Sequence, residues 1–246
     1  MLRTLWAWVV GVLLTVFWST LGILTWPLSP RGDLYLRYAR IWSRSILALL
    51  GIDLAVDGRD RLDPGGTYLF MSNHSSTFDI FALFVATEHR LRMVAKRGLF
   101  FIPIFGWSLW MCGFIPIDRS NRERAIRSLE KAGGRIRSGI SVLVFPEGTR
   151  SRTGKLMRFK KGVFVLALEA GVPVVPVVVL GTDAIMEKGS IEVRQGTVTV
   201  RFGAPIPTDG LDVEGGERDR LMARVREAMI DLGAQPDPET AGGRPG

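Results

Sequence analysis

The sequence predicts an α/β fold: a mixed, largely buried sheet flanked by helices, with an N-terminal membrane-associated helical hairpin. Beyond about residue 50, short runs of β-branched and aromatic residues alternate with segments whose apolar residues recur at helical spacing. That alternation is typical of a sheet covered by helices, and continuous apolar strands indicate burial on both faces. Before residue 50, an uncharged apolar run predicts the hairpin.

Residues 1–50 carry the predicted hairpin, which we interpret as a membrane anchor. Thr4 to Pro30 contains no charged residue, and its core, Leu5 to Leu24, is long enough to cross the hydrocarbon layer as a helix. A second apolar stretch, Ser45–Val56, follows a basic segment at residues 31–44. We expect these two stretches to span the bilayer or to embed in it. A buried core helix is the alternative interpretation.

An α/β domain is expected over residues 51–233. Strands are predicted at Ile52–Asp57, Tyr68–Ser72, Gly113–Ile117, Ser141–Phe145, Val172–Leu180 and Thr197–Phe202. Helices are predicted at Phe78–Ala86, Arg122–Arg137, Gly162–Ala170 and Glu217–Leu232. Residues 234–246 are rich in Pro, Gly, Asp and Glu and are expected to form a disordered tail.

Composition narrows the classes of function. The chain has 32 Lys and Arg against 24 Asp and Glu, a formal net charge of +8. A basic and apolar chain favours a phosphate-bearing partner such as a membrane surface, a nucleic acid or a phosphorylated substrate. A nucleic acid is the least favoured of these, because the basic residues lie beside apolar segments and no nucleic-acid-binding motif is present. One Cys excludes a disulfide framework, and one Cys with two His argues against a structural zinc site.

The first candidate for chemistry is His74, which follows an apolar strand directly. Ligands bind at the carboxyl ends of strands in open α/β sheets, so His74 is expected at a binding edge. Asp79 comes five residues later, in the first turn of the next predicted helix. A tight loop brings the carboxylate to one ring nitrogen and leaves the other as a proton acceptor. Taken alone, each of the two residues is also compatible with a structural role.

A second group, Phe145 to Arg152, follows another predicted strand and is expected at the same edge. Gly148 allows a sharp turn, and the guanidinium groups of Arg150 and Arg152 suit a phosphate. We expect Glu147 to hold a substrate hydroxyl or to orient an arginine. A solvated basic turn is the alternative. An oxyanion would find N–H donors in the loop around Ser75–Asp79 or in the turn at Gly148.

Two further cations and one apolar segment complete the candidates. Arg119 ends the segment Gly113–Arg119 and is available to a phosphate, although a surface turn explains it equally well. Lys96 is a weaker candidate of the same kind. The apolar segment Leu99–Phe114 is expected to line an acyl tunnel or to dip into lipid, and core packing is the alternative.

Four blocks together carry a resemblance. They are His74-x4-Asp79, Gly113–Arg119, Phe145–Arg150 and Val172–Val177, in this order. In order and rough spacing they resemble the signature of the glycerolipid acyltransferase family typified by bacterial 1-acyl-sn-glycerol-3-phosphate acyltransferase. The resemblance implies a catalytic pair at His74 and Asp79. It also implies substrate contacts at Arg119, Glu147, Gly148, Thr149 and Arg150, and a structural or acyl-site role for the Val-Pro block.

The resemblance also implies an activity and a location. The expected reaction moves a fatty acyl group from acyl-CoA or acyl carrier protein to lysophosphatidic acid, giving phosphatidic acid, without a metal or other cofactor. Another lyso-lipid acceptor, such as lyso-ornithine lipid, is the alternative within this class. The expected location is the bacterial inner membrane, with the active site on the cytoplasmic face.

Two rival functions come from other classes. A non-catalytic membrane lipid-binding protein explains the hairpin and the basic residues, but it gives no reason for the spacing of His74 and Asp79. A serine hydrolase would use the same pair, but the chain lacks a Gly-x-Ser-x-Gly motif.

Overall fold

A computed structural model describes residues 1–118, 120–211 and 216–238. The α-helices are α1 (Leu2–Leu24), α2 (Asp33–Leu49), α3 (Phe78–Ala86), α4 (Phe105–Met111), α5 (Arg122–Arg137), α6 (Gly162–Ala170), α7 (Thr182–Ile185) and α8 (Glu217–Asp231). The strands are β1 (Ile52–Asp57), β2 (Leu69–Ser72), β3 (Leu91–Lys96), β4 (Ile115–Ile117), β5 (Ser141–Val144), β6 (Val174–Leu180) and β7 (Gly196–Phe202). Short 3-10 helices are η1 (Trp26–Leu28), η2 (Arg59–Arg61) and η3 (Arg97–Phe101).

The sheet is mixed and has the strand order β1-β7-β6-β2-β5-β3-β4. Strands β6, β2, β5, β3 and β4 run parallel, while β7 pairs with β6 in the antiparallel direction. The carboxyl ends of the five parallel strands therefore meet at one edge. This confirms the predicted fold class and places the loops after β2 and β5 beside each other, because these strands are neighbours.

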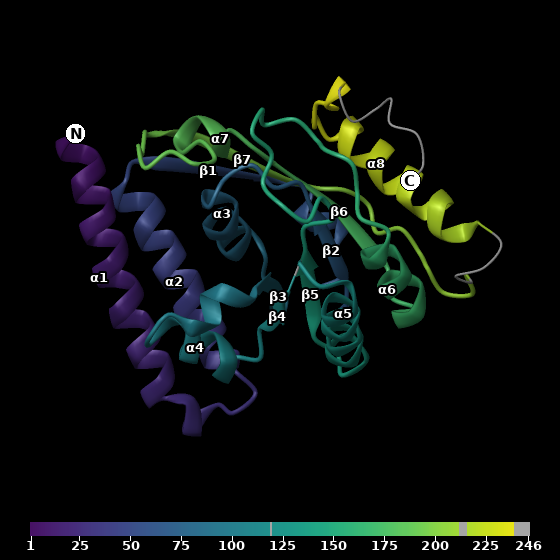
Figure 1. Ribbon diagram of the computed structural model, residues 1–246, viewed down its shortest axis with the longest axis horizontal. Coiled ribbons are helices and arrows are strands. Elements are labelled where there is room, and N and C mark those ends of the chain that lie inside the picture. The colour runs from purple at the N-terminus through teal and green to yellow at the C-terminus, as the bar shows by residue number, and fades with distance from the viewer. Residues whose placement is uncertain (119, 212–215, 239–246) are drawn as a thin grey trace.

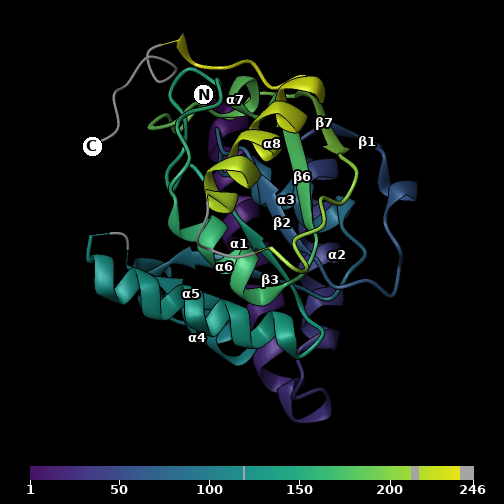
Figure 2. The same ribbon diagram turned by 90° about the vertical axis from the view of Figure 1, so that its right-hand side faces the viewer.

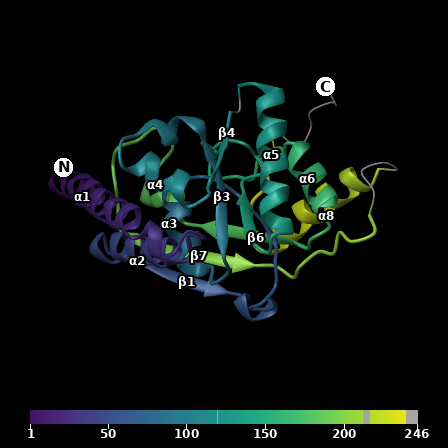
Figure 3. The same ribbon diagram turned by 90° about the horizontal axis from the view of Figure 1, so that it is seen from below.

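Helices cover both faces of the sheet (Figures 1 and 3). Helices α2, α3 and α4 pack on one face around a core that includes Phe70 and Leu83, and α1 lies outside them against α2 and α4. Helices α5, α6 and α8 pack on the other face around a core that includes Phe164 and Val178, and Figure 2 shows this side. Strands β2, β5 and β6 are almost entirely apolar because both of their faces are buried, whereas the edge strand β1 alternates buried and more exposed residues.

The N-terminal hairpin exists, but its second arm differs from the prediction. That arm is α2 (Asp33–Leu49), whereas the predicted stretch Ser45–Val56 ends in strand β1. The basic segment forms the helix because its apolar residues, such as Leu36 and Ile46, recur on one buried face and its arginines lie on the other. Arg37 and Arg44 are exposed, whereas the half-buried Arg40 donates to the backbone carbonyls of Thr87 and His89.

Helix α1 is the one helix among the described residues that is long and apolar enough to cross a membrane, judged by length and composition. Its outer face leaves Leu5 and Leu13 each 63% exposed. Its inner face approaches α2 closely at Gly22, where a Cβ atom would lie 2.6 Å from Cδ2 of Tyr35. The helix therefore packs against the domain along one side and exposes apolar side chains on the other.

Strand β3 (Leu91–Lys96) was not predicted, because Arg92 interrupts its apolar run. The Arg92 side chain is 1% exposed and donates to the carbonyls of Leu91 and Arg31, which tie the strand to the turn before α2. Those hydrogen bonds compensate for the loss of water around the buried guanidinium group of this strand.

Residues 234–238 of the expected disordered tail pack against the domain. Leu156 donates its backbone N–H to Gln235 at 2.7 Å and accepts from Asp237 at 3.1 Å, and Ala234 is buried. Residues 239–246 of the predicted tail lie outside the described residues.

Candidate active site

His74 lies in the loop directly after β2, at the carboxyl edge of the sheet as predicted. The preceding residue, Asn73, fixes the strand end: its side chain donates to the Val179 carbonyl at 2.9 Å and accepts from the Val179 N–H at 2.7 Å. The His74 ring stacks on Phe145, with ring centroids 3.9 Å apart. Neighbouring strands β6 and β5 thus hold both the backbone and the ring of His74.

Asp79 binds the His74 ring. Its Oδ2 accepts from His74 Nδ1 at 2.6 Å, from Ser75 N at 2.8 Å and from Ser76 N at 3.0 Å. Its Oδ1 accepts from the Thr182 hydroxyl. The carboxylate is fully buried, and these donors replace the water that burial removes.

The same contacts set the tautomer of His74. An ionised carboxylate only accepts hydrogen bonds, so Nδ1 of the neutral ring carries the proton and Nε2 has a free lone pair. Within the described part of the chain, Nε2 makes no hydrogen bond. The pair is therefore arranged as a general base with Nε2 ready to take a proton.

Glu147 holds the backbone of this loop. Its Oε1 accepts from His74 N at 2.7 Å, its Oε2 accepts from Met157 N at 2.9 Å, and the residue is 2% exposed. Burial raises the pKa of Glu147 to about 7, although the two backbone donors lower it part of the way back. Glu147 thus positions the backbone of His74 through both oxygens, and its predicted contact with a substrate hydroxyl stays a prediction.

The turn that follows carries the expected cation. Gly148 adopts φ of +74°, the left-handed conformation that glycine tolerates best. Arg150 is half-buried and donates from Nη1 to the Thr77 hydroxyl at 3.0 Å, which places the guanidinium next to the loop of His74. Thr149 is exposed beside it.

Lys188 is part of this cluster, and the sequence interpretation missed it. Its Nζ donates to the Arg150 carbonyl at 2.6 Å and lies 3.4 Å from the Thr149 hydroxyl. It comes after α7, far along the chain, in a segment with no recognisable motif. The sequence carried no signal that would have selected it.

The expected oxyanion donors are already in use. The N–H groups of Ser75 and Ser76 bind Asp79, and the N–H of Gly148 donates to the Phe145 carbonyl at 3.0 Å. These three donors stabilise the loops themselves, so an oxyanion would need other N–H groups of the same two loops, such as those of Thr77 and Thr149, and their use stays a prediction.

The remaining candidates lie apart from His74 or outside the described residues. Lys96 is exposed at the end of β3, and β5 separates that strand from β2. Arg119 lies outside the described residues. Among the residues that the structure describes, no group of three or more His, Cys, Asp or Glu side chains is arranged to hold a metal.

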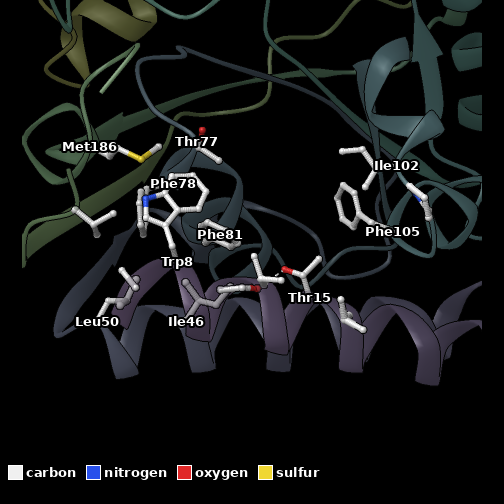
Figure 4. Close-up of a pocket in the computed structure, with 16 residues that line it drawn as sticks. Trp8, Thr15, Ile46, Leu50, Thr77, Phe78, Phe81, Ile102, Phe105 and Met186 are labelled. Atoms are coloured by element: carbon white, nitrogen blue, oxygen red, sulfur yellow. Dashed lines mark hydrogen bonds between the residues drawn. The ribbon is translucent and has the colours of Figure 1, made fainter. Parts of the chain in front are cut away.

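An apolar cavity of about 300 Å³ reaches the catalytic loop from the side of α1 (Figure 4). Its wall combines Trp8 and Thr15 of α1 with Phe78 and Phe81 of α3, and Thr77 and Met186 border it next to the site. Figure 4 shows Ile102 and Phe105 on the opposite wall.

The segment Leu99–Phe114 accordingly has more than one role. Ile102 and Phe105 line the cavity, Phe100 and Leu109 pack in the core, and Trp107 and Trp110 are exposed. Cavity lining and core packing thus both occur in this segment, and its exposed tryptophans add to the apolar surface beside α1.

Comparison with known proteins fits this site. A sequence model of the Acyltransferase family matches residues 53–180. The chain is 34% identical over 205 residues to the 1-acyl-sn-glycerol-3-phosphate acyltransferase of Cocos nucifera, covering 81% of this chain and 65% of that protein. It is 32% identical over 218 residues to 1-acyl-sn-glycerol-3-phosphate acyltransferase alpha of Homo sapiens, covering 88% of this chain and 76% of that protein. The chain belongs to the glycerolipid acyltransferase family.

A solved structure extends the likeness to the whole fold. The structure of the 1-acyl-sn-glycerophosphate (LPA) acyltransferase PlsC from Thermotoga maritima matches with a TM-score of 0.79 and 25% identity, covering 96% of this chain and 97% of that one. The chain spans 53–65% of the length of the first curated relatives that it matches. The region matched by the acyltransferase model contains His74, Asp79, Glu147 and Arg150, whereas Lys188 lies beyond it.

Proposed function

We propose that the protein transfers a fatty acyl group from an acyl thioester, acyl-CoA or acyl carrier protein, to the free hydroxyl of lysophosphatidic acid, giving phosphatidic acid. The observation that carries this proposal is the His74–Asp79 pair, with its 2.6 Å hydrogen bond and free Nε2, at a sheet edge that also holds Arg150. Membership of the acyltransferase family and the names of the relatives support it.

The reaction combines one acyl transfer with two proton transfers, both of which pass through His74. His74 Nε2 takes the hydroxyl proton as the hydroxyl oxygen attacks the thioester carbonyl, and the new C–O bond gives a tetrahedral intermediate. The C–S bond then breaks, and the leaving thiolate takes the proton back from the imidazolium. General-base help of this kind contributes roughly 10²–10⁴-fold. The thioester is already activated, so the reaction uses no metal or other cofactor.

The acceptor phosphate binds at the cationic cluster. Arg150 offers several N–H donors, of which one binds Thr77, and Lys188 brings a second charge to the same turn. Holding the phosphate there positions the acceptor hydroxyl beside His74, which is a proximity contribution. The apolar cavity between α1 and α3 takes a fatty chain, because it opens from hydrocarbon-facing helices toward Thr77.

The exposed apolar face of α1 supports a location of the protein at a membrane surface. Leu5, Leu13 and the exposed Trp107 and Trp110 form the surface that enters the lipid, so a lyso-lipid reaches the site without leaving the bilayer. We place the protein at the bacterial inner membrane, with the site facing the cytoplasm, where thioester donors are made.

Thiol release from acyl-CoA or acyl carrier protein in the presence of lysophosphatidic acid tests the proposal. We expect His74→Ala to abolish release and still bind membranes. We expect Arg150→Ala to raise the KM for lysophosphatidic acid at least about tenfold, as for other lost charge-assisted contacts. Arg137→Ala, an exposed arginine at the end of α5, is the matched control. Near-wild-type turnover of His74→Ala would overturn the assignment, and a higher rate with another lyso-lipid would change the acceptor.

A further inference from the structure

The segment after β6 supports the catalytic loop, residues 73–79, at several points. At the end of the strands, the Asn73 side chain binds both backbone groups of Val179. Further along, the Ser76 hydroxyl donates to the Met186 carbonyl at 2.7 Å. Thr182 lies between these two contacts in the chain, and its hydroxyl donates to the carboxylate of the catalytic pair. The two segments are therefore held in a fixed relation on either side of Thr182.

A sharp turn of the chain places Thr182 at this point. Gly181 has φ of +86°, and a Cβ atom there would clash with the carbonyl oxygen of Thr197 in β7. Glycine alone combines this conformation with such a close approach. Strand β6 therefore ends at Leu180, and Thr182 begins α7 with its side chain fully buried.

The side chains of Ser75, Thr182 and Asp79 form a directed chain of hydrogen bonds. An ionised carboxylate only accepts, so the Thr182 hydroxyl donates its proton to Asp79 Oδ1. Thr182 Oγ1 then accepts from the Ser75 hydroxyl, which lies 3.0 Å away. All three residues are at most 3% exposed, so bulk water offers no substitute donor.

The two oxygens of Asp79 are held differently. Oδ2 accepts from the His74 ring and from two backbone N–H groups. Among the described residues, only Thr182 donates to Oδ1. Donors that meet at one oxygen fix the place of that oxygen, but they do not fix the rotation of the carboxylate plane about it. The Thr182 hydroxyl supplies the second point and keeps Oδ2 aligned with the Nδ1–H of His74.

We propose that Thr182 is a positioning residue of the acyl transfer, which holds the Asp79 carboxylate in line with His74 and is itself oriented by Ser75. The proposal rests on the proposed function, because this alignment matters only if His74 takes the acceptor proton. Thr182 comes two residues after the region that the acyltransferase model matches. It is fully buried and does not line the cavity beside α1, so its effect falls on kcat and not on substrate binding.

Steady-state kinetics with two variants of Thr182 tests the proposal. Thr182→Val keeps the shape of the side chain and removes the hydroxyl, whereas Thr182→Ser keeps the hydroxyl. We expect Thr182→Val to lower kcat roughly 10- to 100-fold, on the scale of one lost hydrogen bond to a charged group. The KM for lysophosphatidic acid and the KM for acyl-CoA should stay within about twofold. Thr182→Ser should keep kcat within about threefold of the wild type.

Thr208→Val is the matched control. Thr208 is also fully buried, and its hydroxyl donates to the Val172 carbonyl at 2.8 Å. Val172 precedes β6, so this hydrogen bond lies at the opposite end of the strand from Thr182. We expect Thr208→Val to lower the melting temperature without changing kcat. If Thr182→Val does not fold, Thr182→Ser and Thr182→Ala make the same comparison, because they differ from each other by the hydroxyl alone.

A double variant separates alignment of the carboxylate from a general loss of stability. Thr182→Val and Asp79→Asn act through the same side chain, so together they should lower kcat by less than the product of their separate effects. Thr208→Val combined with Asp79→Asn has no shared partner, and the kcat of that pair should equal the kcat of Asp79→Asn alone.

The possible outcomes separate the role of Thr182 from the proposed function. Wild-type kcat in Thr182→Val, an equal loss of kcat in Thr182→Ser, or a change confined to KM would each overturn the positioning role. So would equal kcat in Thr182→Ser and Thr182→Ala, or a full product of effects in the double variant. The wild type still releases thiol in all these cases, so the acyl transfer stands. Absence of thiol release by the wild type with every donor would instead refute the proposed function.

Discussion

Replacing Asp79 with Asn separates the charge of the catalytic carboxylate from its geometry. Two backbone N–H groups, from Ser75 and Ser76, point at the position of Oδ2, so an amide NH₂ cannot occupy it. The Asn carbonyl therefore takes that place and still accepts from His74 Nδ1. The NH₂ takes the place of Oδ1 and donates to Thr182, whose hydroxyl turns to Ser75 Oγ, 3.0 Å away. The variant keeps the fold and the tautomer and loses one negative charge.

The size of the effect follows from Coulomb's law. Opposite unit charges with centres about 4 Å apart attract by about 4 kcal/mol at an effective dielectric constant of 20. That attraction stabilises the imidazolium of His74 and is absent from the neutral ground state of the ring. Since each 1.36 kcal/mol is tenfold in rate and the proton transfer is only partly complete in the transition state, we expect Asp79→Asn to lower kcat by roughly 10²–10³-fold.

Asp79→Ala is the contrasting variant. It leaves the buried N–H groups of Ser75 and Ser76 without an acceptor, at a cost of roughly 1–3 kcal/mol each. We therefore expect Asp79→Ala to lower the melting temperature as well as kcat, whereas Asp79→Asn lowers kcat alone. Thiol release and thermal unfolding by circular dichroism measure the two effects on the same preparations.

Three results would contradict this reasoning about Asp79. Wild-type kcat in Asp79→Asn would show that the charge does not assist proton transfer. A large loss of thermal stability in the same variant would show that the amide does not adopt the orientation described. A change confined to the KM for lysophosphatidic acid would show that the residue acts on substrate binding and not on His74.

Three further predictions concern stability and the membrane. The pKa of Glu147 in the folded protein is about 7, above the ordinary value of 4.5, so its contribution to stability is full below pH 4.5 and declines as the pH rises toward 7. The free energy of unfolding of the wild type relative to Glu147→Gln, measured with urea, should therefore fall by about 2–3 kcal/mol from pH 5 to pH 8. A difference that stays constant with pH would refute this prediction. Gly22→Ala should destabilise the protein because the added Cβ would meet Tyr35. Gly11→Ala should stabilise it by up to about 1 kcal/mol, because no atom lies within 4 Å of a Cβ at that position. Equal effects of the two substitutions on the melting temperature would contradict the close packing of α1 on α2. Leu5→Asp with Leu13→Asp on the exposed face of α1 should reduce co-sedimentation with anionic liposomes at an unchanged melting temperature, and full binding would show that this face does not enter the lipid.

The sequence predicts the parts of the site that depend on local chain geometry. His74 and Asp79 are five residues apart, and a strand end followed by a helix start is enough to bring them together. The edge that they share with Arg150 follows from a general property of parallel strands, and the strand order β2-β5 places the two loops side by side. In these cases the sequence pattern and the tertiary structure impose the same constraint.

The parts that were missed depend on contacts between distant segments. Glu147 was expected to hold a substrate hydroxyl or to orient an arginine, and its bond to the N–H of His74 could not be predicted because it joins the loops after β2 and β5. Thr182 and Lys188 join the site only because α7 and the loop after it lie beside the turn at Arg150 and the start of α3. Arg92 concealed β3, because a charge in an apolar run is compatible with a buried strand only when carbonyls of other segments accept its N–H groups.

The neighbours of His74 border two cavities, which bears on how the acyl transfer is organised. A general base without its own nucleophile gains nothing unless both substrates are held against it at once, so most of the rate must come from positioning. Thr77 borders the apolar cavity beside α1, and a second cavity, lined by residues of α5 and α6, is also lined by Phe145, whose ring stacks on His74. Glu147 and Asp79 fix the loop between them through backbone N–H groups. A substitution that shifts this loop should therefore raise the KM for both substrates and also lower kcat. A substitution within one cavity should raise the KM for one substrate only.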